Sequence, residues 1–190
     1  MRLSSWEPVR ELVESSAVWS QFIYRSELDS TNHYLRENKD LEAGTVVLAD
    51  KQTHGHGRRA RKWYSPEGGL WFSFSLGGLS SQSTQELYVE LLNLVQDILG
   101  DYGIEAEVSR PNDLVVGDKK IAGLLIEESA GSYIIGIGIN VNNEASSLPE
   151  VVKEHSTTTK EITGEEIDRT EFLRDFLAGF EEIYEGKNNN

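Results

Sequence analysis

Three strand-like segments joined by very short connections lie in the middle of the chain, and they restrict the possible folds more than any other feature. The segments are rich in Leu, Ile and Val and span residues 114–116, 121–127 and 133–139. Residues 117–118 (Gly-Asp) and 130–131 (Ala-Gly) separate them, as the turns of β-hairpins would. Such short connections join only antiparallel neighbours, because a parallel crossover needs a dozen or more residues. This region therefore predicts an antiparallel meander and excludes a purely parallel sheet.

Further strands and helices are expected on both sides of this meander. The other strands are predicted at 21–24, 45–49, 70–76 and 104–108, and the helices at 8–14, 31–39, 83–99 and 168–184. The helix at 83–99 is the clearest, because Leu87, Leu91 and Val95 recur at helical spacing behind the capping box of Ser83 and Glu86. These elements predict an α+β fold, with a mixed, mostly antiparallel sheet and flanking helices on one or both faces.

The charge and the cysteine content exclude several classes of function. The 190 residues carry 32 Asp and Glu against 18 Lys and Arg, a net charge of −14 that disfavours binding of DNA or anionic membranes over the whole surface. The chain has no cysteine, which excludes disulfides, thiolate metal sites and cysteine nucleophiles and makes a cytoplasmic location the default expectation. No apolar run approaches the roughly 20 residues that cross a bilayer. We expect one soluble domain over residues 1–190, without DNA or membrane as a partner.

One basic cluster stands out against this acidic background. Residues 51–62, with the sequence KQTHGHGRRARK, hold five of the 18 basic residues and no acidic one. Glycines let the backbone approach a ligand closely, and guanidinium groups bind phosphate oxygens in a forked geometry. A solvated basic loop is the alternative interpretation, but the density of charge favours an anionic ligand. His54 and His56 have no third metal ligand at a useful spacing, so no metal site is predicted there.

Three further segments carry side chains suited to binding a ligand. Residues 29–32 (Asp-Ser-Thr-Asn) lie at an expected helix start, where they either cap the helix or offer hydroxyl and N–H groups to a ligand. Residues 111–113 (Pro-Asn-Asp), followed by a hairpin and Lys120, are either a plain turn or a set of groups that handles a nucleotide. The strand at 136–142 contains glycines that permit close approach of a ligand, without the GxGxxG pattern of a dinucleotide fold.

In this order, the segments resemble the catalytic domain of biotin–protein ligases, in the biotin/lipoate ligase superfamily. The family pattern is S-T-N, then G-R-G-R-x-G-R-x-W, K-W-P-N-D, K-x-A-G-I-L-x-E and G-x-G-I-N. The chain has Ser30-Thr31-Asn32, the basic loop as far as Trp63, and the segments 111–113, 120–127 and 136–140. Ordered motifs spread over residues 30–142 form a specific signal.

The resemblance implies a fold related to class II aminoacyl-tRNA synthetases and a reaction in two steps. The carboxylate of biotin would attack the α-phosphorus of ATP, giving biotinyl-5′-AMP and pyrophosphate. The ε-amine of a lysine on a biotin carboxyl carrier protein or domain would then displace AMP. Biotin and ATP are thus the implied substrates, and Mg²⁺ is expected with ATP, held mostly by phosphates and water. A homodimer formed by extension of the sheet is also common in the family.

The resemblance also assigns roles to individual residues. The catalytic residues would be Lys120, Arg58 and Asp113. Biotin would be bound by Ser30, Thr31, Gln52, Gly55, His56, Arg58, Lys120 and Gly123. ATP and the adenylate would be bound by Arg58, Arg61, Trp63, Asn112, Asp113, Lys120 and Asn140. No residue is assigned as a metal ligand.

The chain departs from the family pattern at three places. Ser109-Arg110 replaces Lys-Trp, His56 replaces the first loop arginine, and Ala60 replaces a glycine. The missing lysine normally meets the adenylate phosphate, so a catalytically weakened homologue that binds biotin or the adenylate is one alternative. A lipoate- or octanoate-specific relative is another. Within residues 1–190 we expect neither an N-terminal helix-turn-helix nor a C-terminal β-barrel, and hence no repressor function.

Overall fold

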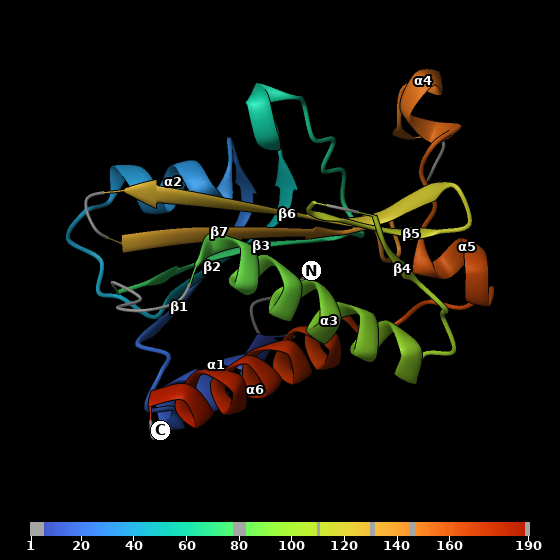
Figure 1. Cartoon of the computed structure of the whole chain (residues 1–190). Coiled ribbons are helices and arrows are strands. Elements are labelled where there is room, and N and C mark those ends of the chain that lie inside the picture. Colours follow the sequence, from blue (N-terminus) through green and yellow to red (C-terminus); the bar gives the residue numbers. More distant parts are fainter. Residues whose placement is uncertain (1–5, 78–82, 110, 130–131, 145–146, 189–190) are drawn as a thin grey trace.

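A mixed β-sheet forms the centre of the computed structural model, which describes residues 6–77, 83–109, 111–129, 132–144 and 147–188 (Figure 1). Its strands are β1 (Gln21–Leu28), β2 (Thr45–Gln52), β3 (Leu70–Leu76), β4 (Glu107–Ser109), β5 (Asp113–Val116), β6 (Lys119–Ser129) and β7 (Ser132–Ile139). They lie in the order β1-β2-β3-β7-β6-β5-β4. Only β1 and β2 pair in parallel; the other described neighbours are antiparallel. The predicted mixed, mostly antiparallel α+β sheet is confirmed.

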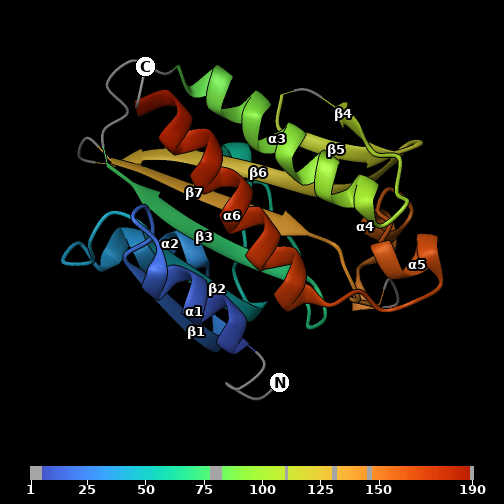
Figure 2. The same cartoon turned by 90° about the horizontal axis from the view of Figure 1, so that it is seen from below.

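Helices cover both faces of this sheet, but unequally. The helices are α1 (Glu7–Ser15), α2 (Thr31–Glu37), α3 (Thr84–Asp101), α4 (Glu150–Lys153), α5 (Thr159–Thr163) and α6 (Arg169–Asn188). Figures 1 and 2 show α1, α3 and α6 side by side on one face, while α2 lies on the other. None of the helices in the described ranges combines the length and the apolar character that crossing a membrane requires.

The alternation of side chains along the strands decides which face receives the core. On β3, Phe72 and Phe74 point to the three-helix face and pack against Phe176 of α6, with ring centroids 5.1 and 6.1 Å away. Ser73 lies between them and points to the opposite face, where its register partner on β7 is Gly136. The main apolar core therefore lies under α1, α3 and α6. A smaller apolar cluster of Ile23, Leu35, Val47 and Ile134 lies between α2 and the sheet, and small and polar side chains occupy the rest of that face.

The structure corrects two sequence predictions. The strand predicted at 104–108 begins only at Glu107, because Ile104 turns back to donate its N–H to Leu99 O (3.0 Å) at the end of α3. Helices α4 and α5 were not expected; with four and five residues they are too short to show helical periodicity. The turn at 117–118 is confirmed, with Gly117 at φ +62°, whereas the turn predicted at 130–131 lies outside the described residues.

Candidate active site

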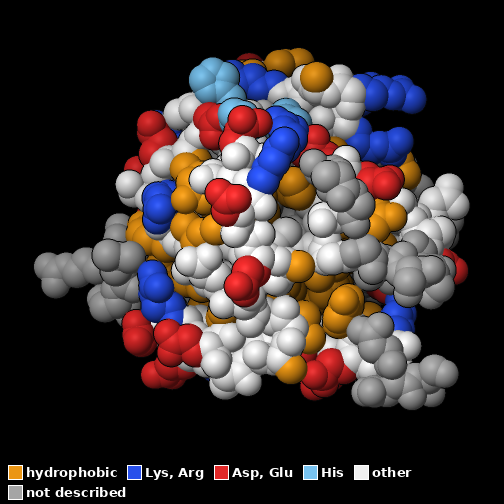
Figure 3. Space-filling view, turned by 90° about the vertical axis from the view of Figure 1, so that its left-hand side faces the viewer, with side chains coloured by type: hydrophobic (Ala, Val, Ile, Leu, Met, Phe, Trp, Pro, Cys, Tyr) orange, Lys and Arg blue, Asp and Glu red, His pale blue; other side chains and the backbone are white. Residues whose placement is uncertain are grey.

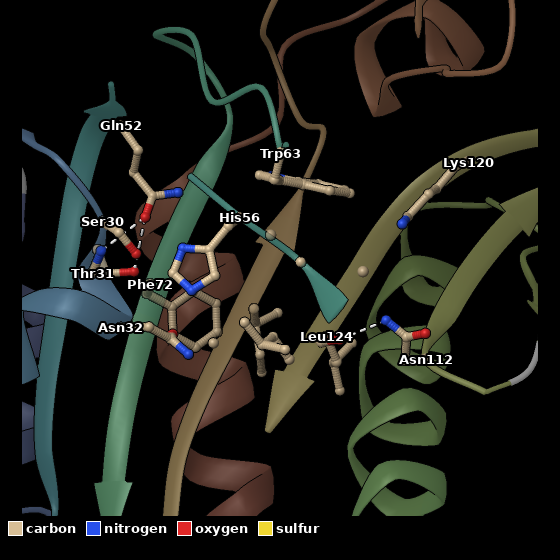
Figure 4. A pocket seen from close by; sticks show the side chains of 16 residues that line it. Ser30, Thr31, Asn32, Gln52, His56, Trp63, Phe72, Asn112, Lys120 and Leu124 are labelled. Atoms are coloured by element: carbon tan, nitrogen blue, oxygen red, sulfur yellow. Dashed lines mark hydrogen bonds between the residues drawn. The ribbon is translucent and has the colours of Figure 1, made fainter. Parts of the chain in front are cut away.

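Three clefts meet on the face of the sheet beside α2, and Lys120 and Trp63 line all three. The first cleft leaves about 430 Å³ of space unfilled by atoms and is open to solvent. Its lining comes from the start of α2, the basic loop, the turn before β5 and strands β2, β3, β6 and β7, namely Ser30, Thr31, Asn32, Gln52, His56, Gly57, Trp63, Phe72, Asn112, Lys120, Gly123, Leu124, Leu125, Gly136, Ile137 and Gly138 (Figure 4). Segments from both halves of the chain therefore build one site.

The floor of this first cleft is made of glycines on neighbouring strands. Gly123 on β6 stands opposite Gly138 on β7. A Cβ atom at Gly138 would lie 2.7 Å from the indole of Trp63, and one at Gly123 would lie 2.9 Å from Lys120 Cε. The absence of side chains at these glycines allows Trp63 to lie directly on the sheet. Its ring packs against that of Trp71 in a T-shaped arrangement, with 6.1 Å between the ring centroids. The glycines thus set the position of both cleft-lining side chains.

Hydroxyl and amide groups form one end of the first cleft (Figure 4). Ser30 is the N-cap of α2 and accepts the His33 N–H through Oγ. Gln52 accepts the backbone N–H of Thr31 at 2.8 Å and donates from Nε2 to Ser65 Oγ at 2.8 Å. Ser30 and Thr31 are buried. These partners hold the polar end rigid while leaving donor and acceptor positions that face the cleft.

Asp29 supports this end from outside. It accepts the Ser30 N–H at 2.6 Å and contacts His33 Nδ1. Burial acts to raise the pKa of Asp29, but the hydrogen bonds from His33 and Ser30 outweigh it, so the pKa is lowered and the group is held as a carboxylate. In Figure 3, histidines gather with basic and acidic side chains at the upper rim of the molecule.

A cation is held at the opposite end of the first cleft. Lys120 Nζ lies 2.7 Å from Asp113 Oδ1 and 4.6 Å from the centroid of Trp63. The backbone of Lys120 donates to His155 O and accepts from Thr157 N–H. About 30% of each side chain of the Lys120–Asp113 pair is exposed, so the ammonium group is accessible to a ligand.

The basic loop closes on itself beside Lys120 and lines the second cleft. His56 and Lys62 form an isolated antiparallel bridge, and Gly57 N–H donates to Arg61 O at 2.8 Å. Arg58, Arg61 and Lys62 line this cleft together with Asp113. Ala60, where the family pattern has glycine, has a φ of 57°, as does Arg59, a conformation that costs on the order of 1 kcal/mol for a residue with a side chain. The cluster of guanidinium groups suits phosphate oxygens.

The third cleft has an apolar side. Leu148, Val151 and Val152 line it, opposite Trp63 and Tyr64. Val151 on α4 is 72% exposed, which is unusual for a branched aliphatic side chain. Asn140 lies at the base of this cleft and donates to Lys120 O at 3.5 Å. A flat apolar group with polar edges fits this lining.

The structure brings the predicted site residues together. The first cleft is lined by Ser30, Thr31, Gln52, His56, Trp63, Asn112, Lys120 and Gly123; the second adds Arg58, Arg61 and Asp113; the third adds Asn140. Gly55 is buried behind the first cleft, where a Cβ would lie 2.6 Å from Trp63 O. Asn112 Nδ2 donates to Leu124 O at 2.7 Å, so part of this side chain holds β6 in place. Arg110 lies outside the described residues.

Sequence reasoning assigned no role to several residues that build the site. Asn32 donates to Glu127 Oε2 at 2.8 Å and accepts from Ser73 Oγ at 2.6 Å. Gly136 makes room for Asn32, because a Cβ there would lie 2.1 Å from Asn32 Oδ1. The strand period of two points Glu127 to the same face as Gly123, which was a usable signal. Ser73 lies in an apolar strand and carried no such signal.

The same residues offer few ligands for a metal ion. Across the described ranges, no group of three or more His, Asp or Glu side chains is arranged to hold a metal ion. Asp113 is the carboxylate that lines the second cleft. One carboxylate together with ligand phosphates is a usual environment for Mg²⁺, so the residues fit a metal that arrives with a nucleotide.

The chain is similar to known proteins in sequence and in fold. The family model described as "Biotin/lipoate A/B protein ligase family" matches residues 24–143. The chain is 36% identical over 186 residues to the bifunctional ligase/repressor BirA of Bacillus spizizenii, covering 93% of this chain and 57% of that protein. It is 32% identical over 162 residues to the biotin–[acetyl-CoA-carboxylase] ligase of Paracoccus denitrificans, covering 79% of this chain and 67% of that protein. The solved structure of an Aquifex aeolicus biotin protein ligase with biotin and ATP superimposes with a TM-score of 0.80 at 39% identity, covering 86% of this chain and 70% of that one.

Proposed function

The chain belongs to the biotin/lipoate A/B protein ligase family, and from that premise we propose that it is an ATP-dependent biotin–protein ligase. It would form biotinyl-5′-AMP and transfer biotin to a lysine of a biotin carboxyl carrier protein or domain. The chain spans 57% of the length of the Bacillus relative. The activity, its substrates and its partner are therefore proposals for this chain. The residues 1–190 would act as one catalytic unit.

The observation that carries the proposal is the meeting of three chemically different clefts at one lysine. Lys120 lines the polar first cleft, the second cleft with its arginines, and the third cleft with its apolar side. A reaction that joins a carboxylate to a nucleoside phosphate requires these three environments around one cation, because two anionic groups must approach each other. Three adjacent clefts of different character would suit the three parts of a biotinyl-adenylate.

In the first step, each part of the substrates would occupy one cleft. The ring of biotin would lie in the first cleft, with its urea at Ser30, Thr31 and Gln52 and its carboxylate toward Lys120. The phosphates would lie against Arg58 and Arg61, and the base would lie in the third cleft. Lys120 would leave Asp113 and stabilise the charge that develops as the carboxylate oxygen bonds to the α-phosphorus and pyrophosphate leaves. Asp113 would hold the Mg²⁺ that arrives with ATP, and the ion would supply neutralisation of phosphate charge.

In the second step, the carrier lysine would attack the carbonyl carbon of the adenylate and AMP would leave. Asp113, freed from Lys120, would accept a hydrogen bond from the incoming amine and orient it. The basic loop lines the second cleft beside Lys120, and it would shield the mixed anhydride from water until the carrier arrives.

The proposal is tested by incubating the protein with ATP, Mg²⁺ and a biotin carboxyl carrier domain, and measuring the carrier by mass spectrometry. Biotin should add one biotinyl group to the carrier, whereas lipoate and octanoate should add nothing. A carrier variant in which arginine replaces the acceptor lysine is the matched control and should stay unmodified. Modification by lipoate in place of biotin would show that the chain is a lipoate-specific member of the family.

A further inference from the structure

A chain of hydrogen bonds between side chains runs under the first cleft and links β6 to the polar end of the site. It passes through Glu127, Asn32, Ser73 and Thr31, and the backbone N–H of Thr31 continues it to Gln52 and Ser65. Ser73 is fully buried, and Thr31 and Asn32 are 3% and 4% exposed. Buried polar groups of this kind must find partners inside the protein, so the orientation of each side chain depends on the next.

Glu127 gives this chain its direction. A carboxylate only accepts hydrogen bonds, so Asn32 must turn its Nδ2 toward Glu127 Oε2, at 2.8 Å, and its Oδ1 the other way. Ser73 then donates its single hydroxyl hydrogen to Asn32 Oδ1, at 2.6 Å. That donation leaves Ser73 Oγ as an acceptor.

The direction continues to the cleft through Thr31. Its Oγ1 lies 2.6 Å from Ser73 Oγ and 3.2 Å from Gln52 Oε1. Because Ser73 has already used its hydrogen, the shorter contact requires Thr31 to be the donor. The lone pairs of Thr31 Oγ1 are then left to accept from a ligand.

The polar end therefore presents a fixed pattern to a ligand. Thr31 Oγ1 is an acceptor. Ser30 Oγ accepts the His33 N–H and keeps its hydroxyl hydrogen to donate, and Gln52 keeps one Nε2 hydrogen after donating to Ser65. A cyclic urea carries an N–H beside a C=O and matches this pattern, whereas a dithiolane ring or an alkyl chain has no group that does.

We propose that Glu127 is a positioning residue that fixes the polarity of this chain and thereby selects a cyclic urea; this rests on the proposed function. Glu127 lies near the mouth of the site with its side chain 27% exposed, and it acts through Asn32, Ser73 and Thr31. Arg36 Nη1 at 3.3 Å and His56 Nε2 at 3.8 Å are the basic groups beside its carboxylate. If the polarity were reversed, Ser73 would donate to Thr31 Oγ1 and occupy a lone pair that would otherwise accept from the urea N–H, and the Thr31 hydrogen would turn toward Gln52 Oε1.

The test exchanges the positions of the acid and the amide. Glu127→Gln removes the group that can only accept, so Asn32 is free to turn over. The double variant Glu127→Gln with Asn32→Asp puts the obligate acceptor at position 32, where it accepts from the new amide at position 127 and from Ser73. The direction of the rest of the chain and the net charge are then restored. Exposed Glu128, the next residue on β6, gives the matched control Glu128→Gln.

Dissociation constants of biotin, desthiobiotin and lipoate are measured by calorimetry on the whole chain, without ATP. Desthiobiotin keeps the urea and lacks the sulfur ring, so it separates urea recognition from ring packing. We expect Glu127→Gln to raise the dissociation constants of biotin and desthiobiotin alike by about 10-fold. The weak binding of lipoate should stay unchanged. The double variant should recover most of the loss, and Glu128→Gln should bind as the parent does. With saturating biotin, the rate of adenylate formation in Glu127→Gln should equal that of the parent.

The outcomes separate this inference from the proposed function. Equal biotin affinity in Glu127→Gln and the parent, or a double variant no better than Glu127→Gln, would overturn the role of Glu127 while leaving a biotin ligase in place. A parent that binds lipoate and not biotin would overturn the proposed function itself. Should Glu127→Gln not fold, Ser73→Ala breaks the same chain at its midpoint without changing charge, and it carries the same expectation for biotin against lipoate.

Discussion

Lys120 concentrates the chemistry of the site in one side chain. Its ammonium group has Asp113 at 2.7 Å and the face of Trp63 at 4.6 Å, and the arginines of the basic loop lie across the second cleft. Trp63 and Gly123 restrict where the lysine stem can lie, since a Cβ on Gly123 would touch its Cε and Nζ at 2.9 and 3.0 Å. The charge is therefore preorganised, which is the condition for strong stabilisation of a transition state.

Replacement of Lys120 tests that role. Lys120→Ala should lower the rate of adenylate formation by at least about 100-fold and leave the melting temperature within a few degrees of the parent, since the side chain is partly exposed. Exposed Lys119, which lines none of the three clefts, supplies the control Lys119→Ala. The measurement is single-turnover formation of biotinyl-AMP at saturating biotin and ATP. Near-parental rates in Lys120→Ala would show that the charge at position 120 is not used.

Ser109 is the departure from the family pattern that the structure places most clearly. It is exposed on β4 and pairs in register with Asp113 on β5, so the two side chains share a face of the sheet. A lysine at position 109 would lie beside Asp113 and compete with Lys120 for it. The natural serine leaves Asp113 paired with Lys120.

Ser109→Lys should therefore free Lys120 for the substrate and slow the dissociation of the adenylate by about 10-fold, the size of one charge-assisted contact. Ser109→Gln, similar in length and uncharged, is the control and should behave as the parent does. Dissociation of preformed biotinyl-AMP, followed by its hydrolysis in solution, gives the rate. If Ser109→Lys and Ser109→Gln release the adenylate equally fast, the serine does not explain a weakened enzyme.

At the scale of elements, a buried ion pair fastens α6 to the sheet. Arg169 at the start of α6 lies 3.4 Å from Asp50 on β2 and donates to Gly69 O at 2.7 Å. Tyr24 on β1 donates to the other oxygen of Asp50. Asp50 is two residues before Gln52 on the same strand, so this network also steadies the strand that carries the polar end of the site. Removing one member would leave a buried charge without its partner.

This network predicts a loss of stability at alkaline pH. Burial, together with the hydrogen bond to Asp50 and the charge of that group, raises the pKa of Tyr24 to about 12, from 10.0. The fold favours the neutral phenol, so its stabilisation is complete below pH 10 and is lost as the pH rises toward 12. Tyr24→Phe should unfold more easily at about pH 8, by about 1–3 kcal/mol, and should lose less additional stability by about pH 11 than the parent does. The free energy of unfolding in urea at both pH values is the measurement; parallel losses in the two proteins would contradict the assignment.

For the whole molecule, the sequence predicted the sheet and the four helices α1, α2, α3 and α6 because these depend on local patterns. The hairpin at 117–118 and the capping box of Ser83 and Glu86 appear in the structure as expected. The start of the strand predicted from residue 104 was wrong because the polypeptide first completes the C-terminal turn of α3, where Ile104 N–H bonds to Leu99 O, and β-propensity does not encode such a turn. Helices α4 and α5 were missed because a helix of four or five residues has no periodicity to detect.

Part of the site could likewise be predicted from the sequence, and part could not. Residues within recognisable motifs, such as Ser30, Gln52 and Lys120, could be nominated from sequence and lie around the clefts. Ser73 could not be nominated from the sequence. Its importance comes from its register with Gly136 and its contact with Asn32, and these three residues belong to three different elements, β3, β7 and α2. The path from Glu127 to Thr31 is likewise a property of the assembled sheet and helix.

The central claim is that this arrangement activates the carboxylate of biotin with ATP. The most direct measurement is pyrophosphate release from ATP and Mg²⁺ in the absence of any carrier, with biotin, with lipoate and with neither. Release should depend on biotin, should reach about one equivalent per protein chain as the adenylate is retained, and should be absent with lipoate. Release that is independent of biotin, or equal with lipoate, would contradict the account.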